Sequence, residues 1–171
     1  MDVIKSAVRD IPDFPKPGIL FKDITPVLQN PQAFRAAIDT FKERYRDQKL
    51  DVIAAVESRG FLFGTVLAYE LGLSLALVRK PGKLPYKAIR ESYSLEYGEN
   101  TLEMHEDAVG PGQRVLVIDD LLATGGTAEA AAKLVRRLGG EVVEFAFLIE
   151  LSFLDGRERL SPCPIFSILQ Y

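Results

Sequence analysis

One stretch about two thirds of the way along the chain constrains the fold more than any other: an apolar run that ends in two acids and a glycine-threonine loop. Residues 115–118 read Val-Leu-Val-Ile. Such a run predicts a strand that is buried on both faces of a parallel sheet. Asp119 and Asp120 follow directly. Because successive strand side chains point to opposite faces, we expect only one carboxylate to meet a given ligand atom while the other supports it.

The next residues form what we call the Gly-Thr loop (residues 123–127), with the sequence Ala-Thr-Gly-Gly-Thr. Glycines let backbone N–H groups approach an anion, and a helix expected over residues 128–138 adds the unpaired donors and the dipole of its N-terminus. The spacing fits neither a P-loop nor a dinucleotide-binding fingerprint. An ordinary strand-turn-helix with solvated acids is the alternative. The two acids favour a ligand that places hydroxyl groups between them and a phosphate, such as a ribose 5-phosphate.

The rest of the chain alternates strands and helices. Strands are expected over residues 52–56, 75–78, 142–149 and 165–169. Asn30 and Pro31 predict the start of a helix, and Gly72 predicts the end of another that covers residues 61–71. With 171 residues the chain suits a single domain. We therefore predict an α/β fold with a doubly wound, mainly parallel sheet and a site at the carboxyl ends of its strands.

A basic segment (residues 79–90) carries five cations and no acid: Arg79, Lys80, Lys83, Lys87 and Arg90. Its prolines and glycine predict a loop. Such a charge run is most often a solvated face, but on a chain of net charge −3 it favours an anionic partner. Alternating residues then predict a half-buried strand over residues 92–97, a turn over residues 98–100 and a returning strand. Glu96 is expected on the strand face opposite the tyrosines.

The N-terminal segment begins with a short helix capped by Asp2 and continues through three prolines, which favour an extended path. We expect this path to be fixed against the rest of the chain, because Phe14, Ile19, Leu20 and Phe21 are too apolar to leave in water.

Composition excludes several classes of protein. The net charge argues against a general nucleic-acid or membrane surface. Cys163 is the only cysteine, so neither a disulfide framework nor a cysteine-based zinc site is available. We find no secretory signal and no apolar run of ~18 residues. These features together predict a cytoplasmic protein that binds neither nucleic acid nor membranes.

Residues 115–127 resemble the phosphoribosyl-pyrophosphate (PRPP) motif of the type I phosphoribosyltransferases. Further stretches, at residues 14–25, 57–61, 79–85 and 93–98, resemble the members of that family that use adenine. The likeness runs over nearly the whole chain. It implies a type I phosphoribosyltransferase-like fold in one domain (residues 1–171), with a small hood (residues 1–30) and a flexible loop and β-hairpin (residues 79–105).

The resemblance implies transfer of the 5-phosphoribosyl group of PRPP to adenine, giving AMP and pyrophosphate in purine salvage. The reaction would pass through an oxocarbenium-like transition state without a covalent enzyme intermediate. Mg²⁺ would be carried by PRPP, with no direct protein ligand. A homodimer is also implied, with Phe61 and Phe63 as candidate contacts.

The site residues implied by the resemblance form four sets. The ribose-phosphate set is Asp119, Asp120, Ala123, Thr124, Gly125, Gly126 and Thr127. The pyrophosphate set is Ser58, Arg59, Lys80 and Lys83. The adenine set is Leu20, Phe21 and Lys22, where Lys22 stands in place of an expected Arg. The catalytic set is Glu96 and Arg59.

Two alternatives remain open. A regulator that binds PRPP without catalysing a reaction would keep the fold. It would also need a surface that binds its regulatory target, for which the chain leaves little room. The same transfer to hypoxanthine, guanine or xanthine is the nearer rival, because only the hood bears on the choice of base.

Overall fold

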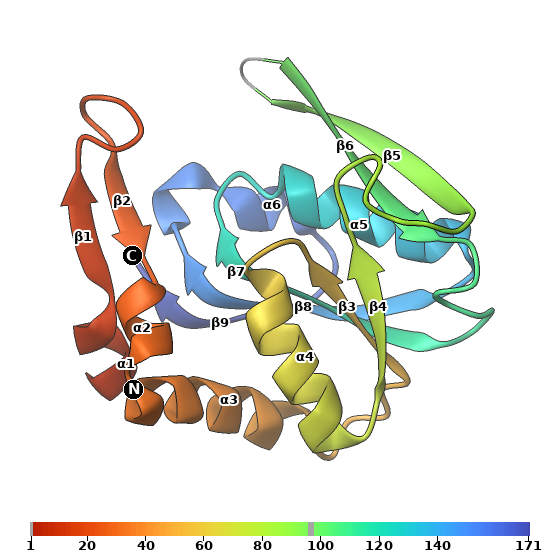
Figure 1. Ribbon diagram of the computed structural model, residues 1–171, viewed down its shortest axis with the longest axis horizontal. Helices are drawn as coiled ribbons and strands as arrows, with labels where there is room; N and C mark the ends of the chain where they lie inside the picture. Colours follow the sequence, from red (N-terminus) through yellow and green to blue (C-terminus); the bar gives the residue numbers. More distant parts are fainter. Residues whose placement is uncertain (1, 96–97) are drawn as a thin grey trace.

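The computed structural model describes residues 2–95 and 98–171. Its centre is a five-stranded sheet in the order β4-β3-β7-β8-β9 (Figure 1). The strands are β3 (Val52–Val56), β4 (Ser74–Val78), β7 (Arg114–Leu122), β8 (Glu141–Glu150) and β9 (Ile165–Gln170). All neighbouring pairs are parallel. The predicted parallel α/β sheet is therefore confirmed, although β7 is longer than expected and contains both acids.

Helices cover both faces of this sheet (Figure 1). Helices α3 (Pro31–Tyr45) and α4 (Gly60–Leu71) pack on one face, and α5 (Gly126–Arg137) packs on the other. The alternation of β7 explains the arrangement, since Leu116 and Ile118 enter the α3–α4 core while Val115 and Val117 enter the α5 core. The prediction of a strand buried on both faces is confirmed.

The helix ends follow the predicted capping residues. The Asn30 Oδ1 accepts hydrogen bonds from the backbone N–H groups of Gln32 (3.0 Å) and Ala33 (3.2 Å) at the start of α3. Gly72 ends α4 in the left-handed conformation, with φ +66°.

The hood consists of α1 (Asp2–Ala7), an antiparallel ribbon of β1 (Arg9–Pro12) and β2 (Leu20–Asp23), and α2 (Thr25–Gln29). An ion pair of 2.6 Å between Arg9 and Asp23 ties the two strands together. The tip of the ribbon projects from the body (Figure 1), and Phe14, Ile19 and Leu20 are 50%, 45% and 48% exposed. The expectation that these side chains would be covered is wrong, because nothing in the described part of the chain forms a second layer over the tip of this ribbon.

A second ribbon, β5 (Ala88–Leu95) with β6 (Gly98–His105), lies against α5 (Figure 1). Two predicted boundaries are wrong here. Arg90 lies in β5 and not in a loop, and the turn predicted over residues 98–100 lies within β6. Cross-strand pairing, such as Tyr93 with Asn100, overrides the turn preference of Gly-Glu-Asn. Glu96 lies outside the described residues.

Two short elements follow β8, namely the 3₁₀ helix η1 (Ser152–Leu154) and α6 (Gly156–Leu160). The sequence reading missed both. Helix α6 packs on α5 beside the Gly-Thr loop. Among the described residues, no helix combines the length and apolar character needed to cross a membrane.

Candidate active site

A cavity of about 370 Å³ lies at the carboxyl ends of β3 and β7. Five segments line it: the turn after β3, the basic segment, the β5–β6 ribbon, the end of β7 and the Gly-Thr loop. The lining residues used below are Glu57, Ser58, Arg59, Lys80, Tyr93, Asp119, Asp120, Ala123 and Thr127. The cavity thus lies at the carboxyl edge of the sheet, where the sequence predicts the site.

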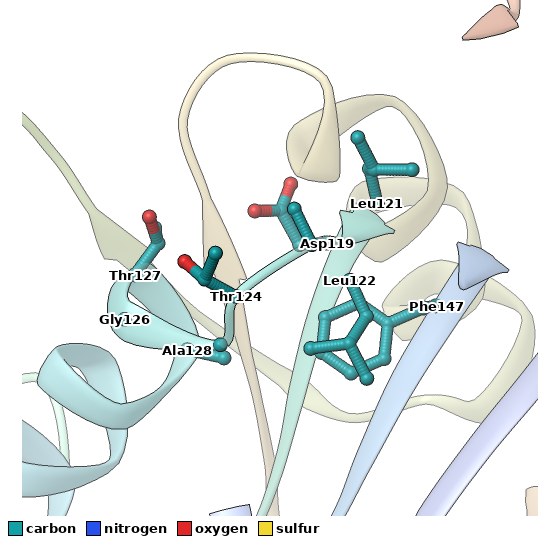
Figure 2. A pocket seen from close by; sticks show the side chains of 10 residues that line it. Asp119, Leu121, Leu122, Thr124, Gly126, Thr127, Ala128 and Phe147 are labelled. Atoms are coloured by element: carbon teal, nitrogen blue, oxygen red, sulfur yellow. The ribbon is translucent and has the colours of Figure 1, made fainter. Parts of the chain in front are cut away.

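The Gly-Thr loop forms a smaller cavity of about 70 Å³ beside the first. Figure 2 shows the side chains of Asp119, Thr124 and Thr127 on one side of the loop, with Leu122 and Phe147 on the other. Helix α5 begins within the loop, at Gly126. The first N–H groups of a helix have no intrahelical acceptor, so this end of α5 offers donors to an anion.

Close packing fixes the loop from behind. Gly125 has φ +81°, and a Cβ at this position would lie 2.8 Å from the Gly156 carbonyl oxygen. A Cβ on Gly156 would in turn lie 2.2 Å from the Ala123 carbonyl oxygen. Helix α6 therefore supports the loop through direct backbone contact. No sequence pattern predicts this role of Gly156.

The two acids of β7 line the same large cavity but differ in their partners. Asp120 is almost buried and forms an ion pair of 2.5 Å with Arg59 Nε. The Asp119 Oδ1 accepts the Asp120 backbone N–H at 2.8 Å. Burial, and then the neighbouring Asp120 carboxylate, raise the pKa of Asp119 well above its ordinary value. Asp120 is thus the acid that pairs with Arg59, whereas Asp119 forms no ion pair with the described residues.

Arg59 connects the β3–α4 turn to this pair. Although burial lowers the pKa of Arg59, the carboxylates of Asp120, Asp119 and Asp23 raise it above its ordinary value. The contribution of Asp23 links the base of the hood electrostatically to the cavity. Ser58 lies next to Arg59 in the cavity wall, after a cis Glu57–Ser58 peptide bond.

Two carboxylates anchor the basic segment. Glu57 accepts hydrogen bonds from Arg79 Nε (2.9 Å) and from the Lys80 backbone N–H (3.0 Å). Glu103, only 2% exposed, pairs with Arg90 at 2.6 Å and accepts the Gly82 backbone N–H at 3.1 Å. The predicted run of five cations is therefore partly neutralised within the fold.

Three lysines of the segment, Lys80, Lys83 and Lys87, are exposed. We find no ion pair between them and the described residues. Lys80 lines the large cavity, whereas Lys83 does not.

The predicted adenine set lies outside both cavities. Lys22 Nζ contacts the Asp10 carboxylate at 2.6 Å and lies 4.0 Å from the centroid of the Tyr171 ring. Its charge is therefore used within the hood. Phe21 packs edge-on against Phe14, with ring centroids 5.1 Å apart, while Leu20 is half exposed.

Sequence reasoning missed three polar groups in the cavity wall, Glu57, Tyr93 and Asn100. Glu57 was included only as part of a motif, and its role as an anchor depends on a contact across 22 positions. Tyr93 was assigned only to the buried face of a strand. Its hydroxyl lies 3.0 Å from Thr127 Oγ1. The alternation of residues 92–97 was the available signal, but it could not name the partner.

No group of three or more His, Cys, Asp or Glu side chains suited to a metal ion occurs in the described part of the chain. The donor set of the large cavity, one carboxylate available to ligands beside hydroxyl and cationic groups, fits a Mg²⁺ ion that arrives with phosphates and keeps its waters.

Comparison with known proteins shows the family of this chain. Residues 23–162 match the family described as a phosphoribosyl transferase domain. The chain is 56% identical to an adenine phosphoribosyltransferase of Anaeromyxobacter dehalogenans over 171 residues, which cover 100% of this chain and 99% of that protein. The chain belongs to the adenine phosphoribosyltransferase family. The resemblance inferred from the motifs is confirmed.

Solved structures of this family superpose closely on the chain. The adenine phosphoribosyltransferase of Thermoanaerobacter pseudethanolicus has a TM-score of 0.96 and 54% identity, with 99% of each chain covered. The Saccharomyces cerevisiae enzyme, with a TM-score of 0.93 and 42% identity, covers 98% of this chain and 97% of its own. It was solved with adenine and an imino-altritol bisphosphate.

The contact face suggested for a family-type dimer needs one correction. Phe63 is fully buried in its own core, where it packs near Phe34 and Phe41, so it is not available to a second chain. Leu62 and Tyr69, 41% and 85% exposed, occupy the outer face of α4 instead.

Proposed function

We propose that this chain transfers the 5-phosphoribosyl group of PRPP to adenine, giving AMP and pyrophosphate in purine salvage, with the residues assigned below. The observation that carries the assignment is the single cavity that joins the Gly-Thr loop, the two acids, Arg59 and Lys80. A substrate with a phosphate at one end of a ribose and a pyrophosphate at the other matches these groups in type and order.

The ribose 5-phosphate is assigned to the end of β7. The Gly-Thr loop receives the phosphate through the hydroxyls of Thr124 and Thr127 and the N–H groups at the start of α5. The Asp119 carboxylate accepts hydrogen bonds from the ribose hydroxyls. Asp120 keeps Arg59 beside them.

The pyrophosphate is assigned to Ser58, Arg59, Lys80 and Lys83, together with the Mg²⁺ that PRPP brings. Lys80 already lines the cavity, and Lys83 follows it on the same exposed segment. When bound, Mg²⁺ supplies positive charge to the phosphate oxygens.

The chemistry requires no nucleophile from the protein. Departure of pyrophosphate leaves an oxocarbenium-like carbon, so the chain must hold both phosphates, stabilise the leaving group and aim the base nitrogen. Arg59 stabilises the leaving pyrophosphate. Glu96 is assigned as the acid that stabilises adenine as the leaving group in the reverse direction.

The base is assigned to the hood. Adenine offers a 6-amino donor and an N1 acceptor, and the extended backbone of β2 can offer one group of each kind. The exposed side chain of Leu20 and the ring of Phe21 provide apolar surface for the purine. Hypoxanthine reverses the donor and acceptor at this edge, so rejection by ~10-fold or more per mismatched group is expected.

One assay separates this proposal from its rivals. The purified chain is incubated with PRPP, Mg²⁺ and each purine or pyrimidine base in turn, and nucleotide formation is measured. AMP formation with a strong preference for adenine in kcat/KM is expected. Comparable turnover of hypoxanthine or guanine would move the base assignment away from adenine, and PRPP binding without any turnover would favour the regulator.

We also propose that the chain forms a homodimer, with the outer face of α4 around Leu62 and Tyr69 as the contact. Light scattering should give twice the chain mass, and Tyr69→Glu should give a monomer. A stable, fully active monomer of the unaltered chain contradicts this proposal. The cytoplasmic location expected from the single cysteine stays a prediction.

A further inference from the structure

Tyr93 lines the large cavity but has no role in the residue assignments proposed above. It belongs to β5 and is only 9% exposed, because it packs in the hydrophobic core on the α5 side of the sheet. Both Tyr93 and Thr127 line the large cavity. Their hydroxyl oxygens lie 3.0 Å apart, a hydrogen-bond distance. A side chain of the ribbon therefore contacts the loop assigned to the 5-phosphate.

The packing around Tyr93 holds its hydroxyl in place. A Cβ on Gly126 would lie 3.1 Å from the Tyr93 Cδ2, so the ring occupies the space beside the first residue of α5. Farther along the ribbon, Glu91 pairs with Arg137 of α5 at 3.2 Å. These contacts hold β5 against α5 and keep the Tyr93 ring beside Thr127.

The hydrogen-bonding capacity of the two hydroxyls gives the contact a direction. A phosphate only accepts hydrogen bonds, so a Thr127 hydroxyl that binds it must donate its single proton to the phosphate. The Tyr93 hydroxyl must then donate to Thr127 Oγ1. Because a phenol is a good donor, this arrangement fixes the Thr127 proton toward the ligand and strengthens the hydrogen bond that it donates.

We propose that Tyr93 is a positioning residue of the ribose 5-phosphate site, which orients the Thr127 hydroxyl and thereby makes the β5–β6 ribbon part of that site. The inference rests on the assignment of the Gly-Thr loop to the 5-phosphate. It also means that β5 contacts the Gly-Thr loop when the phosphate is bound there. Glu96 follows Tyr93 by three positions in the sequence.

Tyr93→Phe tests the proposal, because it removes only the hydroxyl and keeps the ring packing. Calorimetry with ribose 5-phosphate should show binding weakened by about 3- to 10-fold, the usual value of one hydrogen bond. Binding of inorganic pyrophosphate should change by less than about 2-fold. A purely structural tyrosine would instead affect both ligands alike. Tyr45→Phe, the same change at a buried tyrosine of α3 that lines neither cavity, is the matched control and should alter neither.

A double-substitution cycle isolates the contact with Thr127. In a Thr127→Val background, Tyr93→Phe should cost less than about 2-fold in ribose 5-phosphate affinity, whereas in a Thr127→Ser background it should keep most of its effect. Single-substitution effects that simply multiply, or an unchanged ribose 5-phosphate affinity in Tyr93→Phe, overturn the proposal. AMP formation by the unaltered chain is measured separately, so failure here leaves the assigned reaction standing.

Discussion

The two anion sites proposed for this chain are built in different ways. The Gly-Thr loop is fixed by backbone packing, since Gly125 and Gly156 leave no room for a Cβ between the loop and α6. The basic segment is more open at Gly82, where no other described residue outside its chain neighbours has an atom within 4 Å of an added Cβ. It is held by hydrogen bonds and ion pairs to Glu57 and Glu103.

This difference suits the two ligands. The 5-phosphate group stays attached to the ribose throughout the reaction, so a preformed site can orient the substrate at little cost in entropy. Pyrophosphate has to enter and leave, and a segment held by charge can open for it. The comparison predicts that steric changes damage the first site and charge changes damage the second.

The largest effect is expected from a matched pair of glycine substitutions. Gly125 and Gly82 both have positive φ, at +81° and +76°, so Gly→Ala carries a similar strain of about 1 kcal/mol at each. Only Gly125→Ala adds a collision with the Gly156 carbonyl oxygen. It should weaken ribose 5-phosphate binding by at least ~100-fold, because a displaced loop misplaces every donor. Calorimetry on Gly82→Ala should show nearly unchanged affinity, and equal losses in the two variants would break the comparison.

Asp119→Asn should reduce kcat/KM for PRPP by roughly 30-fold, since the amide weakens the acceptor for the ribose hydroxyls. The same change should raise Tm at neutral pH by roughly 2–4 °C, the shift that about 1 kcal/mol causes in a domain of this size. The pKa of the Asp119 carboxyl is higher in the folded chain than its unfolded value of 3.8. The folded chain is therefore destabilised as the pH rises from 3.8 through the folded pKa. The Tm difference between variant and unaltered chain should therefore be small near pH 4 and grow toward pH 7. A Tm difference that shrinks as the pH rises would contradict a raised pKa of Asp119.

Arg79→Gln should act on the basic segment alone. It leaves the Glu57 carboxylate without its cation at the edge of the cavity, which repels the pyrophosphate and loosens Lys80. We expect pyrophosphate binding about 10-fold weaker and ribose 5-phosphate binding unchanged. Arg46→Gln, which removes an exposed cation from the end of α3, serves as the control.

The smallest effect is expected for Lys83→Ala. Lys83 is exposed and does not line the cavity, so its loss should raise KM for PRPP by only about 3-fold and leave KM for adenine unchanged. A loss of ~100-fold would show that the segment closes much farther over the substrate than this structure does.

Sequence patterns predicted those parts of the molecule that rest on local periodicity. The apolar run of β7 and the cap at Asn30 are of this kind. The hood ribbon was missed, because polar residues and prolines in β1 and β2 give no strand pattern.

In the site, the residue types at the end of β7 identified the loop and its acids, but pairwise contacts did not follow from spacing. Arg59 meets Asp120 across 61 positions, and Tyr93 meets Thr127 across 34. Such pairings depend on which strands become neighbours, and this is fixed by the packing of the whole sheet. The position of Glu96 stays a prediction.

The proposed difference between the Gly-Thr loop, which is fixed by packing, and the basic segment, which is held by charge, is tested most directly by the salt dependence of ligand binding to each. Ribose 5-phosphate and inorganic pyrophosphate are titrated separately by calorimetry, in the absence of Mg²⁺, as the salt concentration rises from about 0.05 to about 0.5 M. We predict that the pyrophosphate Kd rises at least ~10-fold, because exposed lysines are screened, while the ribose 5-phosphate Kd rises less than ~3-fold. Equal salt dependence of the two Kd values would contradict the account.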